Sequence, residues 1–243
     1  MQPLNLNDVV QYIEENIGDF HQRREASLGN LKLQTVIKKK NPYLFRAKNL
    51  LAPDLVRSLL DAHLSSQEEG IFGEFLEGLA IFVCEKVFNG RKSAAEGIDL
   101  EFKREDTLYI ISVKSGPNWG NSNQIKRMKE NFTQAKRILR AGNRNTNIVT
   151  VNGCCYGRDS KPDKGDYLKI CGQEFWELIS ANDRLYIDII HPLNHEAKKR
   201  SEEFAEKYAV VLNLFVEEFL RDFCVQGKID WEKLVKFNSG KKS

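Results

Sequence analysis

The hydrophobic period of the chain changes after Gly90, from the spacing of helices to that of strands. Residues 98–102 (IDLEF) alternate apolar and polar side chains, as a half-buried strand does. Residues 107–115 (TLYIISVKS) are rich in β-branched and aromatic residues, which is typical of a central strand. The residues between them predict a hairpin connection. The chain is therefore expected to build a sheet from this stretch.

Helices are predicted on both sides of the hairpin. Residues 4–26 carry apolar side chains at helical spacing, and a second helix is expected to begin at Pro53. Ser65 or Ser66, followed by Glu68 and Glu69, resembles a capping box and predicts that a separate helix begins there. The further predicted elements are a helix over about 122–141, a strand over 147–157, a short helix over 174–180, a short strand or helix start over 184–190 and a long helix over 194–223. This order predicts an α/β fold, with a small mixed sheet between helices.

Composition limits the class of protein. Of the 243 residues, 41% are hydrophobic and 29% charged, which excludes a disordered, a collagen-like and a membrane-embedded chain. The first residues lack the basic-then-apolar layout of a secretory signal, so a soluble, cytoplasmic protein is expected. The five cysteines are then expected to be reduced, mostly buried thiols. The net charge of +3 is too small to establish nucleic-acid binding, although it permits a local basic surface.

The two predicted strands carry a notable set of polar residues. Because side chains alternate along a strand, Asp99 and Glu101 share one face of the first strand. Ser112 and Lys114 likewise share a face of the second, while Val113 points the other way into the core. If the strands pair, Asp99 approaches Lys114.

A carboxylate beside an ammonium group suits the hydrolysis of a phosphodiester. Asp99 would hold Mg²⁺, which neutralises the phosphate and lowers the pKa of a bound water. Lys114 would orient or deprotonate that water and offset charge in the transition state. The alternative is a cross-strand salt bridge without a catalytic role, on an exposed face of the sheet.

The blocks GIDLEF and SVKSGPNWGNSNQ, with the basic segment IKRMKENFTQAKRILR, resemble the PD-(D/E)XK nuclease superfamily, and more closely its type II restriction endonucleases. With NPYLFRAKN (41–49) and residues 60–83, they resemble a subgroup that cuts palindromes of the GG–any base–CC kind. The resemblance covers roughly residues 40–195 and implies a restriction-endonuclease-like core with helical N- and C-terminal additions. We expect a single nuclease domain over residues 1–243, with a helical part to about 64, a catalytic core over about 65–195 and a C-terminal helix over about 196–225.

The resemblance places Asp99, Ser112, Val113 and Lys114 at the active site. Asp99 matches the metal-binding aspartate and Lys114 the lysine of the motif. The backbone carbonyl of Val113 falls where such enzymes take a third metal ligand. Ser112 departs from the pattern, because it stands where the motif usually has Asp or Glu and a serine brings no charge. A second carboxylate is therefore expected from elsewhere in the chain.

Three acidic residues are candidates for this carboxylate. Glu77 ranks first, narrowly, since many members of the superfamily place an acidic ligand on the helix before the hairpin. Glu130 ranks second, on the helix that follows the motif lysine. Glu101 ranks third, near Asp99 but one pleat farther along the strand.

DNA contacts are predicted from three places: the polar loop after the second strand, the basic helix and a later polar loop. Lys and Arg of the helix suit phosphates, and those of the later loop suit guanine edges in the major groove. The predicted DNA-binding residues are Ser115, Asn118, Asn121, Gln124, Lys126, Arg158 and Lys161. The alternatives are a structured loop with Trp119 packed beneath it and a solvated helix face.

The function that follows is a Mg²⁺-dependent type II restriction endonuclease that cuts double-stranded DNA at a palindromic site. A palindrome favours a homodimer, because the symmetry of the DNA mirrors that of the protein. A cognate DNA methyltransferase is expected in the same system, without a stable complex. The alternatives are a repair or recombination nuclease of the same superfamily and a non-catalytic DNA-binding module, with Ser112 as the sign of a vestigial site.

Overall fold

A computed structural model describes residues 1–38, 40–142 and 147–241. Contacts divide the chain into two compact units. The first, here called the sheet unit, comprises Met1–Gly18 and Phe72–His195, and the second, the helical unit, comprises Asp19–Ile71 and Glu196–Ser243. The predicted catalytic core of 65–195 corresponds largely to the longer segment of the sheet unit. The single domain over 1–243 stays a prediction.

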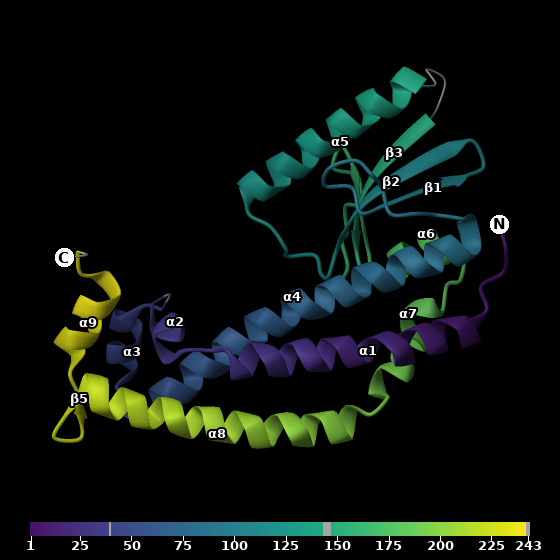
Figure 1. Cartoon of the computed structure of the whole chain (residues 1–243). Helices are drawn as coiled ribbons and strands as arrows, with labels where there is room; N and C mark the ends of the chain where they lie inside the picture. Colours follow the sequence, from purple (N-terminus) through teal and green to yellow (C-terminus); the bar gives the residue numbers. More distant parts are fainter. Residues whose placement is uncertain (39, 143–146, 242–243) are drawn as a thin grey trace. The chain divides into compact units, whose positions relative to one another are not determined.

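The structure contains the following helices and strands (Figure 1). They are α1 (Leu6–Gly29), α2 (Leu33–Ile37), α3 (Pro42–Lys48), α4 (Ala52–Phe88), β1 (Leu100–Arg104), β2 (Thr107–Lys114), α5 (Ser122–Gly142), β3 (Asn147–Cys154), β4 (Leu168–Cys171), α6 (Gln173–Ser180), α7 (Leu185–Asp188), a 3₁₀ turn (Pro192–Asn194), α8 (Ala197–Phe223), β5 (Cys224–Val225), β6 (Lys228–Ile229) and α9 (Trp231–Ser239). Within this part of the chain, no helix is both long and apolar enough to cross a bilayer.

The sheet unit is built on a four-stranded sheet in the order β1-β2-β3-β4. β1 and β2 form the predicted antiparallel hairpin, in which Leu100 pairs with Ile111. β2 and β3 run parallel, with Ser112 opposite Asn152, and β3 and β4 are also parallel. Parallel neighbours need a crossover connection, which α5 provides between β2 and β3. The prediction of an α/β fold with a small mixed sheet flanked by helices is confirmed.

Helices cover both faces of this sheet (Figure 1). On one face, Ile110 and Ile148 pack against Met128 and Phe132 of α5. On the other, residues of opposite parity such as Ile111 pack with α1, α4 and α6. Strands buried on two faces require apolar side chains at successive positions, which explains the almost continuous apolar run of β2.

The helical unit has its own apolar core, made by α2, α4, α8 and α9. The sequence does not predict α9, and the polar residues 238–243 (NSGKKS) predict a frayed tail. Asn238 instead lies within the helix, and its side-chain amide donates to the carbonyl oxygens of Ile37, Lys38 and Lys40. Residues 242–243 of the expected tail lie outside the described residues.

The predicted helix boundary at Ser65 or Ser66 is wrong. α4 is one continuous helix of 37 residues, and both serines lie exposed within it. Serine is tolerated inside a helix when its side chain faces solvent. Glu68 does not cap a helix start, because its carboxylate pairs with Arg24 of α1. In the helical unit, Glu68 therefore stabilises the packing of α4 on α1 and does not mark the start of a helix.

Candidate functional site

Asp99 and Lys114 lie together at one end of the β1–β2 hairpin. Asp99 comes directly before β1 and Lys114 is the last residue of β2, so antiparallel pairing brings the two to the same end. Asp99 Oδ2 lies 3.6 Å from Lys114 Nζ, and both side chains are partly exposed, at 20% and 28%. The contact predicted from strand pairing is therefore present, at a place that solvent reaches.

The backbone of Val113 connects the two charged groups. Its N–H donates to Asp99 Oδ2 at 2.7 Å, and its carbonyl oxygen accepts a hydrogen bond from Lys114 Nζ, also at 2.7 Å. The Val113 side chain is buried in the apolar core, as predicted. This packing fixes both backbone groups and places two oxygens, from Asp99 and Val113, around one ammonium group.

Ser112 has a supporting place in this arrangement. Its side chain is buried, and Oγ lies 3.3 Å from Asp99 Oδ2, to which it donates. Asp99 Oδ2 thus accepts from the Ser112 hydroxyl and the Val113 N–H. Two such donors hold the carboxylate in one orientation. Ser112 fits a role in orienting Asp99 and not that of the missing acid.

Glu77 lies on α4 within the electrostatic influence of this pair. Burial, and then the negative charge of Asp99, raise the pKa of the Glu77 carboxyl. Lys92, whose Nζ lies 3.5 Å from Glu77 Oε1, and Lys114 oppose this shift. Two carboxylates that repel each other at a partly buried place are well suited to share a cation.

The other two acidic candidates have different partners. Glu101 is buried and accepts hydrogen bonds from Arg91 Nε at 2.7 Å and Ser93 Oγ at 2.8 Å. These contacts fasten the segment before β1 to the edge of the sheet. Glu130 is exposed on α5 and pairs with Lys126 on the same helix, at 3.9 Å. Glu77, whose pKa the charge of Asp99 helps to raise, stays the first candidate for the second acid.

The donor set suits a hard divalent cation. Asp99 and Glu77 offer carboxylate oxygens and Val113 a carbonyl oxygen, and the Lys114 ammonium already lies near two of these three residues. Mg²⁺ in proteins is typically held by one or two carboxylates, with water and substrate phosphate completing its octahedron. Within the described residues there is no cluster of three or more His, Cys, Asp or Glu side chains. The oxygen donors named above fit Mg²⁺, which takes oxygen ligands.

The loop after β2 contains several of the predicted DNA-binding residues. The carbonyl oxygen of Ser115 accepts the Tyr156 N–H, and Asn118 is exposed. Asn121 and Gln124 form a capping box at the start of α5. Asn121 Oδ1 accepts the Gln124 N–H at 3.1 Å, and Gln124 Oε1 accepts the Asn121 N–H at 3.0 Å. These two side chains thus have a structural role in starting α5. From the sequence, a polar residue in this role looks the same as one that contacts DNA.

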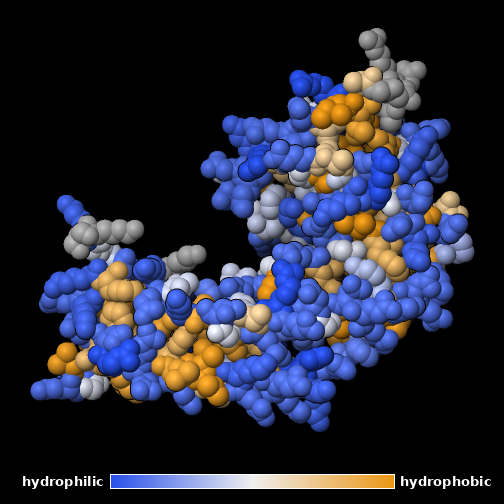
Figure 2. All heavy atoms as spheres, viewed as in Figure 1, coloured by the Kyte–Doolittle hydropathy of each residue, from blue (hydrophilic) through white to orange (hydrophobic). Residues whose placement is uncertain are grey.

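Basic side chains of α5 form ion pairs on an exposed surface. Lys126 pairs with Glu130, Arg127 with Glu96 at 2.9 Å, and Lys129 with Asp166 at 2.9 Å. Figure 2 shows hydrophilic atoms over the N-terminal part of α5, where these pairs lie. Such exposed pairs are weak and exchange readily for phosphate contacts.

Arg158 and Lys161 lie exposed on the loop between β3 and β4. Asp159 anchors this loop, because its carboxylate pairs with Lys164 at 2.8 Å and with Lys169 at 3.3 Å. The hydrogen bonds from Lys164 and from the Lys161 N–H lower the pKa of Asp159 to about 2. Lys169, on β4, also donates to the carbonyl oxygen of Pro117 at 3.0 Å, which ties β4 to the loop after β2.

Two residues of the site were not singled out from the sequence as a pair. Asn152 on β3 is buried, and its side-chain amide donates to the Ser112 carbonyl at 3.3 Å. Trp119 Nε1 donates to Asn152 Oδ1 at 3.0 Å. The available signal was Asn152, a polar residue near the middle of the largely apolar strand NIVTVNGC.

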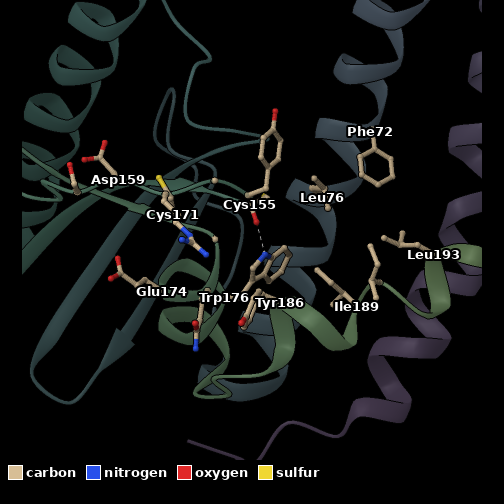
Figure 3. A pocket seen from close by; sticks show the side chains of 17 residues that line it. Phe72, Leu76, Cys155, Asp159, Cys171, Glu174, Trp176, Tyr186, Ile189 and Leu193 are labelled. Carbon is tan, nitrogen blue, oxygen red and sulfur yellow. Dashed lines mark hydrogen bonds between the residues drawn. The ribbon is translucent and has the colours of Figure 1, made fainter.

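A cavity of about 720 Å³ adjoins this end of the sheet (Figure 3). Phe72, Leu76 and Ile189 line it, together with Trp176, whose Nε1 donates to the Cys155 carbonyl at 2.8 Å. Arg158 also lines it, whereas Asp99 and Lys114 do not. The cavity is mainly apolar, so the charged pair outside it remains the candidate for the chemistry.

The chain matches a known protein family over most of its length. Residues 7–201 match the family described as type II restriction endonuclease EcoO109I. The match includes Glu77, Asp99, Lys114 and the whole four-stranded sheet. No curated protein sequence matches the chain.

Proposed function

Because the chain belongs to the type II restriction endonuclease EcoO109I family, we propose that it cuts double-stranded DNA at a palindromic site in a Mg²⁺-dependent reaction. Membership makes the chain a DNA-binding, site-specific deoxyribonuclease. The observation that supports the proposed chemistry is the contact of Asp99 and Lys114 at the end of the hairpin.

The metal would be held by Asp99 and Glu77 together with the Val113 carbonyl oxygen. When bound there, Mg²⁺ supplies positive charge that offsets the scissile phosphate and lowers the pKa of water. Ser112 and the Val113 N–H keep the Asp99 carboxylate in one orientation for this purpose. Glu77 takes the place of the acid that the motif has at position 112.

Lys114 acts on the water and on the phosphate. Its ammonium group lies beside the metal-binding oxygens, so it can orient the attacking water in line with the scissile bond. It also offsets the negative charge that develops on the phosphate in the transition state. Asp99 and Lys114 therefore have separate tasks at one phosphate.

The partners follow from the substrate. A palindromic site, of the GG–any base–CC kind, presents two equivalent strands, and a symmetric homodimer can place one active site at each. Arg158 and Lys161, exposed on an anchored loop, are the proposed contacts to base edges, and Lys126 a contact to phosphate. The enzyme would work in the cytoplasm, where a cognate methyltransferase protects the host DNA.

The experiment is a digest of a large DNA of known sequence, with Mg²⁺ or with EDTA, followed by sequencing of the fragment ends. The expected result is a set of sharp bands whose ends share one palindrome and which EDTA abolishes. A smear without shared ends would indicate a repair or recombination nuclease. Intact DNA with a shifted band would indicate a binding module. Sedimentation equilibrium of the same sample tests the homodimer.

A further inference from the structure

The indole ring of Trp119 lies next to the Lys114 ammonium group. The distance from Lys114 Nζ to the ring centroid is 5.3 Å, which is within the range of cation–π attraction. Trp119 belongs to the loop between β2 and α5 and packs against the apolar cluster that contains Ile110 and Phe132. One side of the ring is thus fixed by the core, and Lys114 has a rigid neighbour.

Asn152 fixes the ring further. It lies opposite Ser112 in the β2–β3 register, and its side chain is 1% exposed. Its Nδ2 donates to the Ser112 carbonyl and its Oδ1 accepts from Trp119 Nε1. A buried amide without partners is costly, so these two bonds hold Asn152 and, through it, the indole. The ring is tied to the strand that carries Lys114.

The partners of Lys114 suggest why this ring matters. The ammonium contacts Asp99 Oδ2, the Val113 carbonyl and the Trp119 ring. The first two are the oxygens proposed to hold the metal. The aromatic ring has no oxygen that could bind Mg²⁺, so its contact with Lys114 is unaffected when a metal occupies the two oxygens. It is therefore the neighbour that can hold the ammonium in place while the oxygens serve another cation.

We infer that Trp119, anchored by Asn152, is a positioning residue that holds Lys114 at the scissile phosphate. This inference rests on the proposed function. It differs from a DNA contact by Trp119, which would affect binding, whereas positioning of Lys114 affects the rate of cleavage at saturating DNA.

The test compares Trp119→Leu and Trp119→Phe on a duplex that the unchanged enzyme cuts. Trp119→Leu is expected to lower the single-turnover rate about tenfold or more, with the Kd for DNA, measured with Ca²⁺ in place of Mg²⁺, within about threefold. Trp119→Phe, which keeps a ring but loses the Nε1 donor, is expected to recover part of the rate. Trp231→Leu is the matched control, since Trp231 also lies beside a cation, Arg46, but in the helical unit.

A second readout needs neither metal nor DNA. Lys114→Met is expected to change the tryptophan emission of the free protein, and the change is expected to disappear in a Trp119→Phe background. Both readouts are normalised to folded protein by circular dichroism. If Trp119→Leu is misfolded, the cleavage rate of Trp119→Phe and the tryptophan emission of Lys114→Met test the inference.

Three outcomes would overturn the inference. They are an unchanged rate in Trp119→Leu, a loss confined to Kd, and an emission that does not respond to Lys114→Met. Failure of the proposed function is distinguishable, because then the unchanged enzyme does not cut the duplex.

Discussion

The carboxylate of Asp99 lies 3.6 Å from the ammonium of Lys114, although Asp99 comes directly before β1 and Lys114 is the last residue of β2. Antiparallel pairing of β1 with β2 brings them together, and the buried Val113 fixes the backbone groups between them. The pair is a product of the sheet register. Catalytic side chains at the ends of strands are positioned more precisely than side chains on loops.

The choice of the second acid gives the first prediction. Glu77→Gln is expected to lower cleavage by about 10²-fold or more, because it removes a proposed metal ligand. Glu130→Gln is the matched control, and its rate is expected to stay within about twofold, since Glu130 pairs with Lys126 on the exposed side of α5. Rates are measured over a range of Mg²⁺ concentrations. A large loss in Glu130→Gln with a normal Glu77→Gln would reverse the assignment.

Glu77 also gives a prediction on stability. Burial and the charge of Asp99 raise its pKa in the folded protein, so its contribution to stability is present at low pH and is lost as pH rises through the folded-state pKa. Without Mg²⁺ at pH 8, Glu77→Gln is therefore expected to raise Tm by roughly 1–3 °C. Added Mg²⁺ should raise Tm in the unchanged protein more than in the variant. Calorimetry with and without Mg²⁺ checks both. A lower Tm in metal-free Glu77→Gln would contradict the claim that the ionised Glu77 carboxylate destabilises the folded protein.

Ser112 is predicted to matter little for cleavage. Its Oγ is the more distant of the two donors to Asp99 Oδ2, at 3.3 Å against 2.7 Å for the Val113 N–H. Ser112→Ala leaves the stronger bond in place, so the expected loss in cleavage rate is less than about tenfold. Single-turnover kinetics measure it. A complete loss of cleavage would mean that the hydroxyl itself takes part in the chemistry.

Asp159 is predicted to stabilise the loop that carries Arg158 and Lys161. Lys164 and the Lys161 N–H lower the pKa of Asp159 to about 2, so its contribution is present at neutral pH and is lost as pH falls from about 4 towards 2. Asp159→Asn is expected to cost about 1–2 kcal/mol at pH 7, after allowance for solvent screening. Urea unfolding at pH 7 and pH 3 checks this. The difference in free energy of unfolding between the unchanged protein and Asp159→Asn should be smaller at pH 3. An equal difference in free energy of unfolding at both pH values would exclude the ion pairs of Asp159 as the cause of the stabilisation.

The sequence was sufficient for features that depend on strand periodicity. Alternation along two short strands predicted the hairpin, the inward Val113 and the meeting of Asp99 with Lys114, and all three are present. These features are local, since the hairpin connection fixes the register of the two strands.

Features set by distant contacts were not predictable in the same way. The Asn152–Trp119 bond depends on the parallel register of β2 and β3, which the crossover through α5 determines. The continuity of α4 depends on partners in α1, such as Arg24 for Glu68, which a local capping pattern does not reveal. The choice among the three acids likewise required the pairing of Glu101 with Arg91.

The measurement that tests the central claim most directly uses the duplex mapped in the digest, with the unchanged enzyme and Lys114→Ala side by side. The account predicts that Lys114→Ala lowers the single-turnover cleavage rate by about 10²–10³-fold or more, while the Kd for the duplex stays within a few-fold. Cleavage by the unchanged enzyme should stop with EDTA and resume with Mg²⁺. Normal cutting by Lys114→Ala, or cutting that persists in EDTA, would contradict the account.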